Sequence, residues 1–256
     1  MLLWLYLPVN TTIMEKKKIV VLSGAGISAE SGIQTFRGGS GLWDNVPVEE
    51  ICSVEGWVRN PAKVTAFYNE RRAQLERVEP NEAHRILSEL QEDYDICVIT
   101  QNVDNLHERA GSRGVLHLHG ELTKVRPEDC YTESDGFSTR YVQDIGYRPV
   151  EIGQRGGPRN RQLRPHIVFF GEAVPNLADA AELVSGADIL LIVGTSMAVY
   201  PAAGLYRYAP EGCRIYMIDP SESPASAVRG VTHIKDVATS GMRQFRNILR
   251  TSGQRL

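Results

Sequence analysis

Cysteine is scarce in this chain of 256 residues. The four cysteines, Cys52, Cys97, Cys130 and Cys213, lie far apart and form no CxxC pair. So few and so widely spaced thiols argue against a disulfide framework and against a Cys-rich zinc site. Reduced thiols are typical of the cytoplasm, so we expect a cytoplasmic protein.

Long apolar runs and a strong excess of one charge are also missing. The apolar stretch at residues 2–7 is too short to cross a bilayer, and neither a basic segment before it nor a small-residue cleavage site after it suggests a signal peptide. A formal net charge of −3 argues against nucleic-acid binding through bulk electrostatics. We therefore expect neither a membrane nor a nucleic acid as partner. Residues 1–14 are interpreted as a disordered tail or a gene-start artefact, with Met14 a candidate start.

Short β-branched runs alternate with helical patterns along most of the chain. The runs lie at 19–22, 95–100, 115–118, 189–193 and 214–218, and the helical stretches at 81–91, 102–110 and 178–185. This alternation predicts an α/β fold, a Rossmann-like doubly wound parallel sheet. Ligands of such sheets bind beyond the carboxyl ends of the strands.

Two stretches interrupt the alternation. Residues 35–76 combine a loop with a helix at 62–74 that has Pro61 at its start, and residues 121–170 begin as a polar, turn-rich segment. We expect these two stretches to form a smaller inserted module. The Rossmann-like domain then consists of residues 15–34, 77–120 and 171–256.

The first β-branched run leads into a glycine-rich turn at residues 24–32. Glycines at such a junction let backbone N–H groups approach a pyrophosphate, although similar turns also occur for structural reasons alone. A dehydrogenase would need an acidic residue about 20 positions later, at the end of a second strand. Here that distance falls in a loop, so a hydride-transfer domain fits poorly.

Five longer motifs are far more specific than the turn alone. They are GAGISAESGIQTFRG at 24–38, TQNVDNLHERAG at 100–111, LHLHGEL at 116–122, RPHIVFFGE at 164–172 and GTSMAVYPAA at 194–203. In this order they resemble the sirtuins, from about Lys18 to the end of the chain. The resemblance implies an NAD-dependent protein-lysine deacylase, with NAD and an acyl-lysine protein or peptide meeting in a cleft. Its products would be nicotinamide, O-acyl-ADP-ribose and free lysine.

The resemblance also assigns residues to NAD. The implied cofactor-binding positions are Gly24, Ala25, Gly26, Ser28, Phe36, Arg37, Gln101, Asn102, Asp104, Gly194, Thr195, Ser196, Asp219 and Ala238. Many relatives carry Asn where Asp219 stands, and a carboxylate can accept but not donate a hydrogen bond there. Taken alone, Arg37 could be a solvated loop charge, and the polar residues 101–104 could cap the following helix.

His119 is the implied catalytic base, and Asn102 the second catalytic residue. A lone histidine near a strand end is more often structural, but His119 precedes Gly120 and Glu121 as the family's catalytic histidine does. A neutral imidazole can accept a proton at neutral pH. His117, two positions earlier, should point to the opposite face of the strand and receives no catalytic role.

The acyl-lysine substrate falls to two further groups of residues. Val168, Phe170, Gly171 and Glu172 are implied to hold the peptide backbone by strand addition, although an ordinary core strand is the alternative. Tyr68 and Arg71 share a helix face; this is commonly mere surface packing, but in the family a Tyr-x-x-Arg pair here marks the branch that recognises succinyl- and malonyl-lysine. A guanidinium can bind a carboxylate bidentately. Cys52 stands where that branch keeps a small residue, so we expect desuccinylation and demalonylation to exceed deacetylation.

The chain departs from the family in its zinc-binding cysteines. Most sirtuins carry two Cys pairs after the catalytic histidine, whereas residues 121–163 contain only Cys130 and no histidine. One thiolate cannot build a tetrahedral site with such partners, so we expect no metal. The module would then be held by packing of Tyr131, Phe137, Tyr141, Ile145, Tyr147 and Ile152. Two other functions stay open: a sirtuin-type ADP-ribosyltransferase, and a non-catalytic NAD- or ADP-ribose-binding module. The oligomeric state is not indicated.

Overall fold

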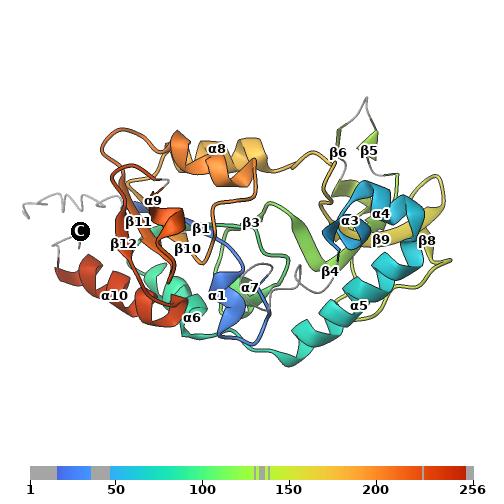
Figure 1. Cartoon of the computed structure of the whole chain (residues 1–256), viewed down its shortest axis with the longest axis horizontal. Coiled ribbons are helices and arrows are strands. Elements are labelled where there is room, and N and C mark those ends of the chain that lie inside the picture. Colours follow the sequence, from blue (N-terminus) through green and yellow to red (C-terminus); the bar gives the residue numbers. More distant parts are fainter. Residues whose placement is uncertain are drawn as a thin grey trace, which may run out of the picture.

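The computed structural model describes residues 16–35, 47–129, 131–132, 136–137, 139–226 and 228–251. Its main element is a six-stranded parallel sheet in the order β12-β11-β10-β1-β2-β3 (Figure 1). The strands are β1 (Lys18–Ser23), β2 (Asp95–Thr100), β3 (Val115–His117), β10 (Ile189–Val193), β11 (Arg214–Ile218) and β12 (Thr232–Ile234). The order reverses between β1 and β10, which makes their carboxyl ends the topological switch point of the sheet.

Helices cover both faces of this sheet, as the predicted doubly wound fold requires. Ile19 and Val21 of β1 pack on one side with residues of α6 (Glu82–Leu90) and α10 (Ala238–Thr251). Val20 and Leu22 point to the other side, toward α8 (Leu177–Ser185) and the 3-10 helix η2 (Ala202–Tyr208). Figure 1 shows α8 on one face and α6 with α10 on the opposite one. The predicted fold class is confirmed.

A second, antiparallel sheet lies at the other end of the molecule. Its order is β7-β4-β9-β8, and β5 and β6 form a separate pair. Helices α3, α4 and α5 lie beside it (Figure 1). The bounds are α3 (Val48–Ile51), α4 (Val54–Arg59), α5 (Pro61–Arg77), β4 (Gly120–Pro127), β5 (Tyr131–Thr132), β6 (Gly136–Phe137), η1 (Thr139–Tyr141), β7 (Gln143–Asp144), β8 (Arg155–Gly156) and β9 (Arg161–Ile167). Three short helices complete the chain: α1 (Gly26–Ala29), α7 (Leu106–Arg109) and α9 (Ser223–Ser226).

Helix α5 is fixed by hydrogen bonds to the backbone of β4 and of the segment between β7 and β8. The helix starts with Pro61 in its first turn, as predicted. The side-chain amide of Asn69 donates to the carbonyl of Val150 at 2.7 Å and accepts from the Val150 N–H at 3.0 Å. Arg72 is fully buried and donates to Asn69 Oδ1 at 2.6 Å and to the Leu122 carbonyl at 2.8 Å. These bonds hold the helix that carries Tyr68 and Arg71.

Several predicted details need correction. The helix predicted at 102–110 begins only at Leu106, because hydrogen bonds from β3 and β4 hold the preceding residues in an irregular conformation. Ile145 packs beside the buried cluster of the second sheet, but Ile152 is 51% exposed, so its predicted packing role is wrong. The side chains of Tyr131 and Phe137 lie outside the described residues. Strand β12 and helix α10 were not predicted.

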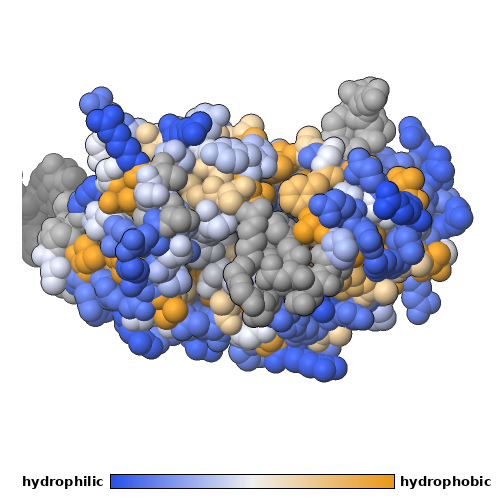
Figure 2. Space-filling view, in the orientation of Figure 1, coloured by the Kyte–Doolittle hydropathy of each residue, from blue (hydrophilic) through white to orange (hydrophobic). Residues whose placement is uncertain are grey.

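The visible surface agrees with this arrangement. Figure 2 shows hydrophilic residues over the outer ends of this face, with more apolar residues toward the middle between α8 and α3. Within the described ranges, no helix is both long and apolar enough to cross a membrane.

Candidate active site

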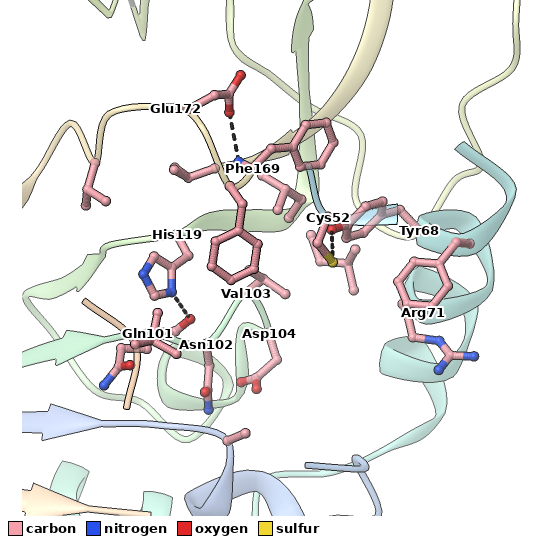
Figure 3. A pocket seen from close by; sticks show the side chains of 18 of the residues that line it. Cys52, Tyr68, Arg71, Gln101, Asn102, Val103, Asp104, His119, Phe169 and Glu172 are labelled. Atoms are coloured by element: carbon pink, nitrogen blue, oxygen red, sulfur yellow. Dashed lines mark hydrogen bonds between the residues drawn. The ribbon is translucent and has the colours of Figure 1, made fainter. Parts of the chain in front are cut away.

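A cavity of about 280 Å³ brings together residues from the loops that follow the parallel strands, from the second sheet and from α5. Figure 3 shows His119 at one end, Cys52 in the middle and Arg71 at the other end. Many of the predicted site residues line it: Ala25, Cys52, Tyr68, Arg71, Gln101, Asn102, Asp104, His119, Val168, Phe170, Gly171 and Glu172. The structure thus gathers the implied catalytic, nicotinamide-side and acyl-side residues around one space.

Buried polar side chains form the floor at one end of the cavity. The Asn102 amide donates to the Gly24 carbonyl and to Ser28 Oγ, both at 3.2 Å. The Ser28 hydroxyl in turn donates to Asp104 Oδ2 at 2.9 Å, and Asp104 Oδ1 accepts from the Leu106 N–H at 3.1 Å. Burial raises the pKa of Asp104, while its hydrogen bonds oppose that shift. The chain after β2 is therefore tied directly to the turn after β1.

The hydrogen bond made by His119 determines which of its ring nitrogens can act as a base. Nδ1 lies 2.9 Å from the Gln101 carbonyl, which can only accept, so Nδ1 carries the proton. In the neutral ring, Nε2 therefore keeps its lone pair. Burial lowers the pKa of His119, which favours this neutral form at neutral pH. Gly120 follows with φ +87°, and a Cβ there would lie 2.0 Å from the His166 carbonyl oxygen, so only glycine fits behind the imidazole.

The predicted adenosine-side residues lie at the carboxyl ends of β10 and β11, outside the cavity lining. Gly26 and Gly194 pack so closely that a Cβ on Gly26 would lie 2.6 Å from the Gly194 Cα. Gln101 donates to Thr195 Oγ1 at 3.1 Å, which links the two loops. Asp219 is half-buried and accepts from the Ser221 N–H.

The remaining predicted cofactor positions are less closely tied to the cavity. Ser196 is exposed, and Ala238 is buried at the start of α10. Phe36 and Arg37 lie outside the described residues.

The segment predicted to hold the peptide is a loop, because β9 ends at Ile167. The Val168 N–H donates to the His119 carbonyl at 2.9 Å, and the Phe170 N–H donates to the Cys52 carbonyl at 2.7 Å. The ordinary core strand considered for this run is therefore not formed. The Phe170 residue is 46% exposed, and Gly171 has φ +96°.

The Glu172 side chain is engaged with the protein itself. Its carboxylate accepts from Arg126 at 2.8 Å, from Arg164 at 2.7 Å and from the Phe169 N–H at 2.8 Å. Figure 3 shows this carboxylate directed away from His119. The guanidinium carbon of Arg164 also lies 3.7 Å from the centroid of the Phe169 ring. A side chain bound in this way fixes the loop, and only the backbone at 172 is left for the predicted role.

The three predicted acyl-side residues have different surroundings. Tyr68 is buried, and its hydroxyl lies 3.3 Å from Cys52 Sγ. Burial raises the pKa of Tyr68 well above its ordinary value, so the hydroxyl stays protonated. The Arg71 guanidinium lies 5.1 Å from the Phe67 ring centroid and 3.6 Å from the exposed Glu70 carboxylate. Its Nε–H is buried and has no hydrogen-bond partner among the described residues.

Apolar cavity residues were largely missed by the sequence reasoning. They include Ile33, Phe67, Val103, Leu122, Phe169, Val174, Val199 and Tyr200. Phe67 and Phe169 each adjoin a predicted site residue, so adjacency was an available signal. Leu122 closes the motif at 116–122, whereas Val174 lies outside all five motifs and its place in the cavity follows only from tertiary packing.

The fold and the cavity define an α/β protein with a histidine-containing site beyond the carboxyl ends of its parallel strands. Comparisons with known proteins give the family. The Sir2 family model matches residues 24–201. A Bacteroides thetaiotaomicron protein named NAD-dependent protein deacylase is 48% identical over 91% of this chain and 98% of its own. A solved structure described as a Sir2 homolog–NAD complex is 38% identical, with a TM-score of 0.76 over 94% of this chain and 92% of that one. The chain belongs to the Sir2 family.

Proposed function

We propose that this chain is an NAD-dependent protein-lysine deacylase that removes succinyl and malonyl groups faster than acetyl groups. The activity is supported by its family and by relatives that carry that name, including one from Helicobacter pylori, 48% identical over 90% of this chain. The supporting observation within the site is His119, whose Nε2 is left as a base in a cavity that Asn102 and Asp104 also line. The substrate class is an acyl-lysine protein or peptide.

The residues at the switch point fit a dinucleotide. Polar groups and glycine turns follow four neighbouring strands, β11, β10, β1 and β2, along one edge of the sheet. This edge is where open α/β sheets bind such ligands. Gly24 to Ser28 and Gly194 to Ser196 would hold the phosphates and adenosine, and Asn102 with Asp104 would hold the nicotinamide. Bound NAD would supply an anomeric carbon whose leaving group, nicotinamide, departs as a neutral molecule.

The chain's own residues provide a proton acceptor and a shaped cavity. The Gln101 carbonyl holds the His119 tautomer, so that Nε2 can take a proton from a ribose hydroxyl. Asn102 and Asp104, fixed through Ser28, would orient the carboxamide. Phe169, Phe170 and Val103 would surround the acyl-lysine methylenes and exclude water. No metal ion is required for any of these tasks.

The acyl preference rests on Arg71. A guanidinium whose Nε–H is buried and unpaired among the described residues lines an otherwise largely apolar cavity. A buried donor without an acceptor is unfavourable, and an acyl carboxylate would satisfy it. Tyr68 bonds to Cys52 rather than to Arg71, so the phenol would have to change partner to join a clamp.

Replacing Arg71 tests this preference. We expect Arg71→Met to lower kcat/KM for succinyl- and malonyl-peptides about ten- to a hundredfold, the value of a lost hydrogen bond to a charged group. Acetyl-peptide turnover should change little, and Arg77→Met at the end of the same helix should leave all three unchanged. Intact succinyl turnover in Arg71→Met would refute the clamp. ADP-ribosylated protein as product would favour a transferase, and NAD binding without nicotinamide release a binding module.

We also propose that the small module, residues 35–76 and 121–170, folds without zinc. The module contains a buried apolar cluster of Val125, Val150 and Leu163. The two hydrogen bonds between Asn69 and Val150 also join this part of the module to α5. Among the residues described, no group of three His, Cys, Asp or Glu side chains could hold a metal ion. Cys130 lies outside them.

A further inference from the structure

The loop at residues 101–104, which carries Asn102 and Asp104, is held by three successive backbone carbonyls. The Gln101 carbonyl accepts from His119 Nδ1 at 2.9 Å, and the Val103 carbonyl accepts from the Leu122 N–H at 2.7 Å. Between them, the Asn102 carbonyl accepts from His117 Nδ1 at 3.0 Å. All three donors come from the segment that runs from β3 into β4. This segment therefore sets the path of the loop behind the predicted nicotinamide pocket.

His117 differs from His119 because both of its ring nitrogens face acceptors. Nδ1 faces the Asn102 carbonyl, and Nε2 lies 2.8 Å from the Glu108 carboxylate on α7. A neutral imidazole has only one N–H and can donate only one of these bonds. The His117 side chain is 7% exposed, whereas that of Glu108 is 40% exposed and can stay ionised in contact with water. Both contacts are satisfied when the ring is an imidazolium and the glutamate a carboxylate.

The groups around His117 favour a positive charge. Glu108 on α7 contacts it directly, and Glu121 on β4 and Asp104 in the loop interact with it electrostatically at longer range. The histidines nearby, His107 and His166, add no competing charge, since burial lowers the pKa of each to about 3. Burial alone would lower the pKa of His117 and favour the neutral ring. The hydrogen bond to Glu108 and the charge of Glu108 outweigh this effect and raise the pKa of His117.

We infer that His117 and Glu108 form an ion pair that positions the Asn102 backbone, and through it the side chains that hold nicotinamide. A charged donor makes a stronger hydrogen bond to the carbonyl than a neutral one. This hydrogen bond fixes the Asn102 backbone, and the side-chain amide of Asn102 can then donate to the Gly24 carbonyl and to Ser28 Oγ. His117 lies outside the cavity lining, so it acts as a positioning residue. This role rests on the proposed function of the same site.

Glu108→Gln is the sharpest perturbation, because glutamine keeps the size and an acceptor but not the charge. We expect it to lower kcat/KM for NAD about ten- to a hundredfold, as a small displacement of positioning groups does. The inhibition constant for nicotinamide should rise by a similar factor, while KM for the acyl-peptide stays unchanged. Glu108→Asp, which keeps the charge, should restore part of the loss. Glu79→Gln is the matched control, since Glu79 pairs with Arg109 of the same helix at the surface.

A direct measurement of the charge does not depend on catalysis. In nitrogen-15 NMR spectra of histidine-labelled wild-type protein at pH 7, both His117 ring nitrogens should carry protons, with the signals assigned by their loss in His117→Gln. In Glu108→Gln one proton should be lost at the same pH. A singly protonated His117 in the wild type, or a Glu108→Gln variant that changes thermal stability alone, would overturn the inference. A wild type that releases no nicotinamide would instead refute the proposed function, while the NMR result would still decide the charge.

Discussion

Removal of the negative charge at Glu172 should destabilise the protein strongly. The Glu172 carboxylate forms ion pairs with two guanidinium groups, at 2.8 Å from Arg126 and 2.7 Å from Arg164. The side chain of Glu172 is 10% exposed, that of Arg126 1% and that of Arg164 4%. In Glu172→Gln both cations would remain buried beside a neutral amide.

The size of this effect follows from the burial of the three groups. Breaking a buried ion pair by neutralising one partner costs about 3–5 kcal/mol. Because a glutamine oxygen can still accept one of the hydrogen bonds, we expect the lower end, about 3 kcal/mol of the free energy of unfolding. For a domain of this size that corresponds to a fall in Tm of about 6–12 °C.

Urea unfolding followed by circular dichroism, with calorimetry for Tm, provides the assay. Glu89→Gln is the control, because Glu89 is 64% exposed and pairs with Arg246 at the surface. Such a pair contributes at most about 1 kcal/mol. If Glu172→Gln were no more destabilising than this control, the reasoning on the buried triad would be refuted.

Three other outcomes are expected. Burial lowers the pKa of His119 below 6.5, the ordinary histidine value. The acid limb of the pH profile of kcat/KM should therefore have its midpoint below pH 6.5, with a plateau at neutral pH. A midpoint above about pH 7 would contradict the role of His119 as base. Asn69→Ala should cost about 1–3 kcal/mol of stability, because the Val150 N–H and carbonyl lose their partner, and unchanged urea unfolding would disprove the attachment. Metal analysis of protein purified without chelators should find no stoichiometric zinc, and a chelator should leave Tm unchanged; one zinc per chain would refute the metal-free module.

The parallel sheet was predictable because its strands are continuous apolar runs. The predicted runs at 95–100, 189–193 and 214–218 coincide with β2, β10 and β11. Strands buried on both faces carry this signal in every residue. Strand β12 spans only Thr232–Ile234 and has too few residues for a periodic pattern.

Features that depend on distant partners were not predictable in the same way. The irregular loop before α7 exists because His117, His119 and Leu122 bind its carbonyls, and no local pattern shows that. The direction of the Glu172 side chain was not predicted, because its partner Arg126 lies 46 positions away in the chain. The motif indicated that these residues belong to the site, whereas the direction of each side chain is set by tertiary packing.

The most direct test of the central claim measures three products in one reaction. Purified protein would be incubated with NAD and, separately, with succinyl-, malonyl- and acetyl-lysine peptides, and the mixtures analysed by mass spectrometry. We predict equal amounts of nicotinamide, O-acyl-ADP-ribose and free-lysine peptide, formed faster with the two acidic acyl groups and lost in His119→Ala. Failure to release nicotinamide with any of the three peptides would contradict the account.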